Sequence, residues 1–320
     1  MKSVLFKCIV FSLLLVWVIP AFVMSFFDVQ GEEHQIAQST TEQFAQTTIR
    51  EDRILLLQDE TVAELSWEDY LTGVLLCEMP GSFCMEAKKA QAVVARTYAM
   101  KLLESGYKHG AAIICSDPNC CQGYIAPDTY LKSFPDASSV EEARQAVRET
   151  EGVVITYDEA LIDATYFSCS GGKTEDAVAV WGMDVPYLQA VLSPGEEKAA
   201  VFTDTVRFSA GQFEAVLDRD LPGTPDSWFG PVSYTQGGGV DTIEIVQKLY
   251  TGTDLRMKLG LRSTAFSITA IGDSILITTK GFGHRVGMSQ YGAQAMAETG
   301  ADYVTILMHY YQGVEITSGY

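Results

Sequence analysis

Glu78 stands at an unexpected place in a pattern of apolar residues. Side chains spaced three and four residues apart lie on one face of an α-helix. On the face that runs from Trp67 to Glu78, five of six positions are large and apolar or aromatic, and the sixth is a carboxylate. The six positions are Trp67, Tyr70, Leu71, Val74, Leu75 and Glu78.

The expected end of this helix bears on the protonation of Glu78. Pro80 and Gly81 stop the helix, so Glu78 lies in its last turn. Partial burial and the negative end of the helix dipole both disfavour the carboxylate anion, which raises the pKa. A carboxylic acid that stays protonated near neutral pH can act as a general acid. The alternative is a frayed helix end that leaves Glu78 in water.

A second group of reactive residues comprises His109, Cys115, Cys120 and Cys121. Thiolates and imidazole are the ligands that zinc prefers, and such close spacing favours a metal site over a disulfide framework. A vicinal disulfide between Cys120 and Cys121 would be strained. A bridge between Cys115 and Cys120 is the alternative if the chain works in an oxidising compartment.

The composition of the chain limits the classes of function. With 320 residues, 47% of them hydrophobic, the chain can bury a core for one or two domains. A net charge of -19 and a pI near 4.5 argue against nucleic-acid binding, because phosphates need a basic surface. The acidic surface is compatible with a domain outside the cytoplasm.

The first fifty residues predict a membrane anchor. Residues 1–7 carry Lys2 and Lys7, residues 8–27 are almost wholly apolar, and residues 28–50 are polar and read as a linker. An apolar helix of this length spans roughly 28 Å, close to the thickness of a bilayer core. The lysines place the N-terminus in the cytoplasm and residues 51–320 outside it. A cleaved signal peptide is the rival interpretation.

The rest of the chain predicts helices and strands in separate runs, which is typical of an α+β fold. We expect a central catalytic core, with motifs at 66–175 and 281–313, and one or two arms from about 185–280 beside a groove. Arg96 lies inside an otherwise apolar helix and either snorkels to the surface or faces the same cleft as Glu78. Helices are expected at 66–78, 85–104, 139–149, 209–217, 289–298 and 302–312, a hairpin at 152–167, and several short strands in 243–277.

Three motifs, in this order, resemble the stage II sporulation protein D family. They are WEDYLTGVLLCEMPGSFCMEAKKAQAVVARTYA from Trp67, DATYFSCSGGKT from Asp163, and GHRVGMSQYGA from Gly283 followed by ILMHYYQGVEI. The resemblance covers most of the chain after residue 50 and is weakest between about 185 and 280. It also includes the membrane-anchored N-terminus.

The resemblance implies a peptidoglycan lytic transglycosylase of endospore-forming bacteria. Such an enzyme would cut glycan strands, preferably free of stem peptides, during engulfment of the forespore. It would sit in the mother-cell membrane, facing the space between the two membranes. The expected partners are the glycan strands and the stage II sporulation proteins P and M.

The resemblance also assigns site residues. Glu78 matches the family's catalytic glutamate in its E-M-P motif, and Arg96 matches the arginine of A-R-T-Y. The second and third motifs imply further substrate-binding residues: Tyr166, Ser168, Ser170, Gly171, His284, Gly287, Met288, Ser289 and Gln290. Clostridial members are similar around the cysteines and carry a C-x4-H-C zinc site, but here Cys120 stands in place of the histidine. We therefore expect a mainly structural Zn²⁺ on Cys115, Cys120 and Cys121, with His109 as a possible fourth ligand.

The chemistry expected of Glu78 differs from hydrolysis by two carboxylates. Glu68, Asp69 and Glu86 lie off the helix face that carries Glu78 and look like capping or surface acids. One carboxyl group is enough for a lytic transglycosylase, because the C6 hydroxyl of N-acetylmuramic acid replaces water. Two other classes stay open. Cys169 with His284 could form the nucleophile and base of a cysteine amidase or peptidase, and the chain could be a peptidoglycan-binding scaffold without activity.

Overall fold

A computed structural model describes residues 53–106 and 108–320. Its first elements are strands β1 (Arg53–Gln58) and β2 (Thr61–Ser66), followed by helix α2 (Trp67–Glu78). Ser66 caps α2, because its hydroxyl accepts a hydrogen bond from the Asp69 amide at 3.1 Å and donates to the Asp69 carboxylate at 2.8 Å. The apolar face predicted for α2 is confirmed, since Tyr70, Leu71, Val74 and Leu75 are buried.

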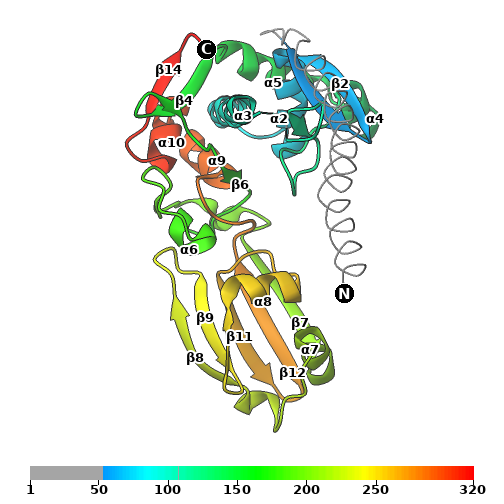
Figure 1. The fold of residues 1–320 in the computed structure, drawn as a ribbon, viewed down its shortest axis with the longest axis vertical. Helices are drawn as coiled ribbons and strands as arrows, with labels where there is room; N and C mark the ends of the chain where they lie inside the picture. The colour runs from blue at the N-terminus through cyan, green and yellow to red at the C-terminus, as the bar shows by residue number, and fades with distance from the viewer. Residues whose placement is uncertain (1–52, 107) are drawn as a thin grey trace, which may run out of the picture. The chain divides into compact units, whose positions relative to one another are not determined.

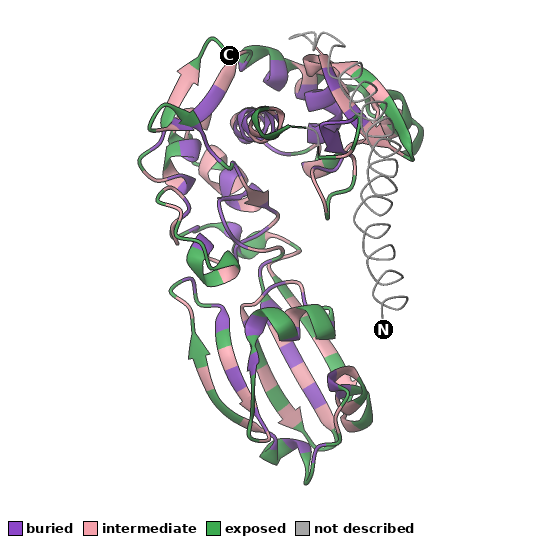
Figure 2. Cartoon of the chain, viewed as in Figure 1, coloured by how far each residue is buried: buried purple, intermediate pink, exposed green. Residues whose placement is uncertain are grey.

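Helix α3 (Met85–Ser105) lies at the centre of the helical part (Figure 1). Its run of small side chains allows close approach of neighbours, and the helix packs against α2, α5 (Ala137–Glu149), α9 (Gln290–Glu298) and α10 (Tyr303–Tyr310). One hydrophobic cluster lies between α3, α2, α5 and β1, and a second lies between α3, α9 and α10. Figure 2 shows α3 as a mainly buried helix.

Short strands join parts of the sequence that lie far apart. β4 (Val153–Tyr157) and β5 (Ala160–Leu161) form the predicted hairpin, and β14 (Glu315–Ser318) pairs with the other edge of β4. β6 (Tyr166–Phe167) does not continue this hairpin. It pairs in parallel with β13 (Met288–Ser289), in the register Met288 to Tyr166 and Ser289 to Phe167. This pairing brings the second and third motifs together.

Residues 203–280, here called the β-rich subdomain, have a hydrophobic core of their own. One sheet has the order β11-β12-β7 and the other β10-β9-β8. Buried residues alternate along β12, as Figure 2 shows, because one face of its sheet covers the core. The strands are β7 (Thr203–Ser209), β8 (Phe229–Tyr234), β9 (Val240–Ile245), β10 (Lys248–Thr251), β11 (Phe266–Ile271) and β12 (Ser274–Lys280).

The several short strands expected in 243–277 are present as β9, β10, β11 and β12. A helix, α8 (Gly252–Leu259), lies among these strands, and the Thr251 hydroxyl caps it by accepting from the Asp254 amide at 3.0 Å. The segment at 222–239, which is rich in proline and glycine, contains β8, and β8 pairs with β9. The remaining elements are β3 (Ile114–Cys115), α4 (Pro127–Ser133), α6 (Ala177–Trp181), α7 (Ala210–Leu217) and the short 3-10 helices η1 (Glu196–Lys198) and η2 (Pro225–Ser227).

The α+β prediction is confirmed by these helices and small sheets. The predicted anchor and linker lie outside the described residues. Within 53–106 and 108–320, no helix combines the length and the apolar character needed to cross a membrane.

Candidate active site

Glu78 ends α2 and meets donors from three distant parts of the chain. Its Oε1 accepts a hydrogen bond from the Gly123 amide at 2.8 Å, and its Oε2 accepts from Gln290 Nε2 at 3.5 Å. The Tyr166 phenol forms a third hydrogen bond to the carboxyl group. The carboxyl is therefore held in one place rather than frayed into solvent.

Burial raises the pKa of Glu78 above the ordinary glutamate value. The hydrogen bonds from Gly123, Gln290 and Tyr166 act in the opposite direction, because they stabilise the anion. Desolvation is the larger effect, so the net pKa shift is upward. The same three donors can stabilise the negative charge that appears on the Glu78 carboxylate when the acid gives up its proton. The group is thus suited to cycle between acid and carboxylate.

Tyr166 is placed at Glu78 by the β6–β13 pairing. Burial and the neighbouring Glu78 charge raise the pKa of its phenol well above the usual value, so the phenol stays a hydrogen-bond donor. The His284 ring packs between Phe167 and Trp181, with ring centroids 5.5 and 5.4 Å away. Its Nε2 donates to the Tyr166 carbonyl at 3.0 Å, which ties the histidine to the strand that carries this tyrosine.

His284 is a neutral ring with a defined tautomer. Nε2 carries the proton because a carbonyl accepts from it, and Nδ1 accepts from the Val286 amide at 3.1 Å. Burial lowers the pKa of His284 to about 4. The ring therefore acts as a spacer beside Tyr166 and does not offer a free basic nitrogen.

The predicted metal ligands come together in the loop after α3. Each of His109, Cys115, Cys120 and Cys121 offers one ligand atom, and these atoms lie within 4.8 Å of one another. His109 Nε2 is 3.2 Å from Cys121 Sγ and 3.8 Å from Cys120 Sγ, and the two sulfurs are 4.0 Å apart. Sulfurs of a tetrahedral zinc site stand about 3.8 Å apart, given a Zn–S bond of roughly 2.3 Å. The four groups could hold a metal ion, and all cysteines of the described chain are free thiols.

The loop that carries the cysteines leads directly to Glu78. Gln122 follows Cys121 and accepts a hydrogen bond from the buried Tyr70 hydroxyl at 2.5 Å. Gly123 comes next and donates to Glu78. A Cβ at Gly123 would lie 2.8 Å from Glu78 Oε1 and 2.9 Å from Cys77 Sγ, so glycine is needed for this approach. The metal cluster thus borders the site of Glu78.

Several residues assigned to substrate have internal partners. Arg96 is 5% exposed and donates to the carbonyls of Val153 and Val147 at 3.0 and 3.3 Å. Its guanidinium therefore joins α3 to the end of α5 and the start of β4, and the cleft role expected for it stays a prediction. Burial lowers the pKa of Arg96 to about 10.

Residues of the second and third motifs also have partners inside the protein. Ser170 and Ser289 are fully buried and donate to Glu196, as does the Gly171 amide, while Met288 is fully buried in the hydrophobic cluster between α3 and α10. Ser170, Ser289 and Met288 therefore have partners inside the protein, Gly171 is half-buried, and direct substrate contact by these four residues stays a prediction. Ser168 presents its carbonyl to the Tyr291 amide and the Ser289 hydroxyl, at 3.0 and 3.4 Å. Gly287 lies against Thr165 in the positive-φ region, where a side chain would be strained.

Cys169 lacks the surroundings of a nucleophile. It is fully buried, and its thiol donates to Glu196 at 3.3 Å. Burial and the Glu196 charge raise the pKa of Cys169 to about 12. A reactive cysteine needs a depressed pKa and an adjacent base, so the alternative of a cysteine amidase or peptidase is not supported.

The acids considered as second carboxylates are engaged elsewhere. Glu68 pairs with Arg144 and Arg148 at 3.4 and 3.5 Å, and Glu86 pairs with Lys89 at 2.8 Å. Asp69 accepts from the hydroxyl of Ser66, the capping residue of α2, at 2.8 Å and pairs with Arg144 at 3.3 Å. These contacts fit the structural roles expected for all three acids.

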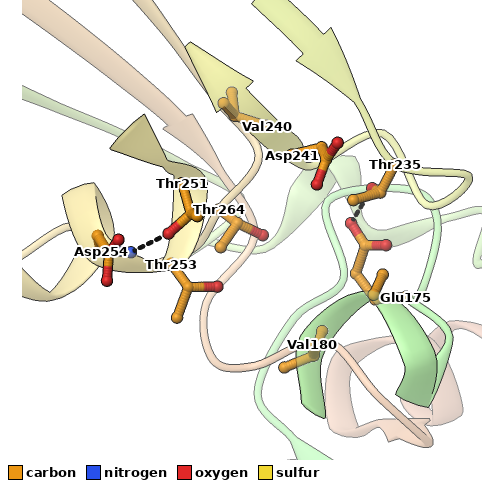
Figure 3. A pocket seen from close by; sticks show the side chains of 10 residues that line it. Glu175, Val180, Thr235, Val240, Asp241, Thr251, Thr253, Asp254 and Thr264 are labelled. Atoms are coloured by element: carbon orange, nitrogen blue, oxygen red, sulfur yellow. Dashed lines mark hydrogen bonds between the residues drawn. The ribbon is translucent and has the colours of Figure 1, made fainter. Parts of the chain in front are cut away.

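A separate cavity of about 340 Å³ lies between α6 and the β-rich subdomain (Figure 3). Glu175 and several threonines line it, and neither Glu78 nor Tyr166 does. The Glu175 carboxylate accepts from Thr235 at 2.7 Å and pairs with Arg285 at 3.2 Å. The cavity is therefore distinct from the candidate active site.

Two residues of this region were missed in the sequence. Gly123 serves through its backbone N–H, which carries no side-chain signature. Its only sequence signal was its position two residues after the cysteine cluster. Glu196 lies in a weakly patterned segment, where the turn residues Pro194 and Gly195 were the sole cue.

Comparison with known proteins shows the family of this chain. The model of the stage II sporulation protein family matches residues 58–157. Stage II sporulation protein D of Bacillus amyloliquefaciens is 38% identical over 281 residues, which cover 85% of this chain and 81% of that protein. The protein of the same name from Bacillus subtilis (strain 168) is 37% identical over 264 residues, with coverages of 81% and 76%. The amidase enhancer of B. subtilis is 30% identical over 307 residues, which cover 78% of this chain and 40% of that protein. The chain belongs to the stage II sporulation protein D family.

Proposed function

We propose that this chain is a peptidoglycan lytic transglycosylase with Glu78 as its general acid and base. One observation carries the proposal. A single carboxyl group with a raised pKa sits among three hydrogen-bond donors, and the nearby acids considered as its partners are bound elsewhere. This arrangement suits a reaction that needs one proton shuttle rather than two carboxylates on opposite sides of a bond.

The reaction runs in two proton transfers. Protonated Glu78 donates to the oxygen of the bond between N-acetylmuramic acid and N-acetylglucosamine, and the C1–O bond breaks. Glu78, now a carboxylate, accepts the proton of the muramic C6 hydroxyl while O6 closes onto C1. The products are a 1,6-anhydro end and a free sugar hydroxyl, and no water is consumed.

The surrounding donors support the carboxylate between these transfers. Gly123 N–H, Tyr166 and Gln290 stabilise the negative charge that Glu78 carries in the intermediate state. Their backbones belong to three different segments that pack together, so little reorganisation is needed when the charge develops.

Similarity to the family supports a proposal for the finer setting of the activity. We propose glycan strands free of stem peptides as the substrate, and forespore engulfment as the process. Stage II sporulation proteins P and M would be its partners, and a membrane anchor at residues 8–27 would hold the domain on the outer side of the mother-cell membrane.

We also propose a structural Zn²⁺ at the cysteine cluster. Cys115, Cys120, Cys121 and His109 would hold it, and the distances between their ligand atoms fit tetrahedral coordination. A bound Zn²⁺ would supply cross-linking of the loop rather than Lewis-acid chemistry, because three thiolates reduce its acidity. The loop in turn holds Gly123 against Glu78.

The deciding experiment is product analysis on purified glycan strands by mass spectrometry. The parent protein is expected to release anhydromuramic ends, and Glu78→Gln none. Ordinary reducing ends would point to hydrolysis and refute the mechanism. The similarity to the amidase enhancer favours one other candidate, a protein that promotes a separate amidase. In that case Glu78→Gln would keep any stimulation of a purified amidase, and no glycan product would form.

A further inference from the structure

Glu196 is a buried carboxylate that the proposed chemistry does not use. Its side chain is 1% exposed, in the short helix η1. Taking a carboxylate out of water is costly unless donors surround it. The neighbours of Glu196 should therefore show why the fold keeps an acid there.

The hydrogen-bond partners of the Glu196 carboxylate in the described chain all donate to it. Oε2 accepts from the Ser170 amide at 3.0 Å, the Ser170 hydroxyl at 2.7 Å and the Gly171 amide at 2.9 Å. Oε1 accepts from the Ser193 hydroxyl at 2.7 Å and from the Ser289 hydroxyl in a short hydrogen bond. One carboxylate thus joins the loop at 169–172, the turn before η1 and the start of α9.

Ser289 connects the hydrogen-bonded groups around Glu196 to the candidate active site. It caps α9, because its hydroxyl accepts from the Gly292 amide at 3.2 Å while donating to Glu196. Gln290, the next residue, donates to Glu78. The packing around Gly292 is tight, because a Cβ there would lie 2.2 Å from Ser193 Oγ and 2.7 Å from Glu196 Oε1. The start of α9 is therefore set by Glu196.

We propose that Glu196 is a positioning residue for the Glu78 site, acting through Ser289 to hold Gln290 against the catalytic carboxyl. The proposal rests on the function proposed for Glu78. Glutamine at position 196 would keep the shape but replace one acceptor oxygen by an NH₂ group, to which no neighbouring N–H or O–H can donate, so the serine hydroxyl facing it would have to reorient. The hydroxyl of Ser289 would then turn away, and Gln290 would lose its fixed position.

The test is a double-mutant cycle on glycan cleavage by the full chain, with Glu196→Gln and Gln290→Ala. A small displacement of a catalytic contact costs up to roughly 100-fold in rate, and we expect Glu196→Gln to lower kcat about tenfold or more with little change in KM. Adding Gln290→Ala to it should cost less than twofold further, because the contact is already lost. If the fall in kcat of the double variant equals the product of the falls in the two single variants, the proposal is overturned.

Glu175→Gln is the matched control. Glu175 is also 1% exposed and accepts hydrogen bonds, but from Thr235, Gly239 and Arg285. Glu175→Gln should lower thermal stability, as Glu196→Gln does. When Glu175→Gln and Gln290→Ala are combined, however, the fall in kcat should equal the product of the two separate effects. Coupling of Glu175 to Gln290 as strong as that of Glu196 would show a general structural effect and refute a specific positioning role.

Two further measurements keep the proposal open to refutation. If Glu196→Gln does not fold, Ser289→Ala replaces it in the cycle, with the same coupling to Gln290 expected and independent effects refuting the link. The side-chain amide NMR signal of Gln290, assigned with Gln290→Ala, should shift in Glu196→Gln and stay in place in Glu175→Gln. An unchanged signal overturns the inference whatever the activity, whereas cleavage by Glu78→Gln at the parent's rate overturns the proposed function alone.

Discussion

At the scale of single residues, Glu78 concentrates the chemistry that the chain can perform. Its raised pKa arises from burial at the end of α2, and its three donors hold the carboxylate when the proton leaves. His284 and Cys169 could have formed a rival site, but a neutral ring with both nitrogens engaged and a buried thiol cannot act as base and nucleophile. The carboxyl group of Glu78 is therefore the candidate that remains for the catalytic group.

Replacing Glu78 by glutamine should abolish glycan cleavage. General acid–base catalysis contributes roughly 100- to 10,000-fold in rate, and glutamine neither donates nor accepts the proton. The measurement is release of anhydromuramic ends, with a circular dichroism melt to show that the variant folds. Asp69→Asn is the control, because Asp69 contacts the capping Ser66 and Arg144 at the start of α2 and takes no part in the reaction, and it should keep activity with a small loss of stability. Cleavage by Glu78→Gln within tenfold of the parent would contradict the assignment.

The pH dependence of activity follows from the upward pKa shift of Glu78. The acid form must be present for the first proton transfer, so kcat/KM should fall as the pH rises through this raised pKa. A rate profile on soluble glycan oligomers measures the position of the fall. A midpoint at the ordinary glutamate value would show that Glu78 is not desolvated in the working enzyme.

The same shift has a consequence for stability. A group whose folded pKa is raised stabilises the fold below its unfolded pKa, and this contribution is lost as the pH rises through the folded value. Glutamine at position 78 has no proton to lose, so the melting temperature of the parent relative to Glu78→Gln should fall as the pH rises from 4 to 7. Thermal melts of both proteins at the two pH values measure this change. A parent that gains stability relative to the variant over this range would contradict the burial argument.

At the scale of elements, the site depends on how α2, the cysteine loop, β6 and α9 meet. α2 brings Glu78 to its last turn, the β6–β13 pair brings Tyr166, and the cap of α9 brings Gln290. The loop from Cys115 to Gly123 supplies a backbone N–H. Each contact is made by a different element, so the site forms only when all four are packed.

Gly123→Ala should lower activity without unfolding the protein. The backbone of Gly123 lies outside the strained positive-φ region, so alanine is accepted there, but its Cβ would push against Glu78 Oε1 and Cys77 Sγ. A displaced carboxyl costs up to roughly 100-fold in kcat. Gly211→Ala is the matched control, because a Cβ at Gly211 meets nothing within 4 Å. It should keep activity and gain roughly 0.5 to 1 kcal/mol of stability.

Removing the metal should disturb the same loop. We expect one zinc per chain by elemental analysis of protein made under reducing conditions. Chelation or Cys120→Ser should lower both the melting temperature and the activity, because the loop that carries Gly123 loses its cross-link. Cys84→Ser lies outside the cluster and should keep the zinc content of the parent. Protein free of zinc and fully active would contradict a structural ion.

At the scale of the whole described molecule, Arg285 joins the β-rich subdomain to the motif that follows β12. Arg285 is 2% exposed and donates to the carbonyls of Ser170, Lys173 and Gly237 at 2.7, 2.7 and 2.8 Å. Its fourth partner is Glu175, with which it forms a buried ion pair. One side chain therefore links the turn at 235–239 to the loop that Glu196 also holds.

Arg285→Leu should destabilise the protein by about 3 to 5 kcal/mol, because the buried Glu175 carboxylate loses its cation. Denaturant unfolding followed by tryptophan fluorescence measures the loss. Arg262→Leu is the control. Arg262 pairs with Asp204 at 3.4 Å but both side chains are about one third exposed, so its loss should cost at most about 1 kcal/mol. Equal losses for the two variants would contradict the importance of the buried pair.

The sequence by itself determined the local features of the site. Helical spacing, a capping serine and a stopping proline place Glu78 at the end of α2, and close spacing gathers the cysteines, because these features act over a few residues of chain. The tertiary structure alone decided what surrounds Glu78, since Gly123 and Gln290 lie 45 and 212 residues away in sequence. It also decided that Arg96 faces backbone carbonyls and that Ser170 and Ser289 face Glu196. The physical reason is that a backbone N–H, or a polar side chain that suits both a cleft and a core, takes its role from the packing of distant elements.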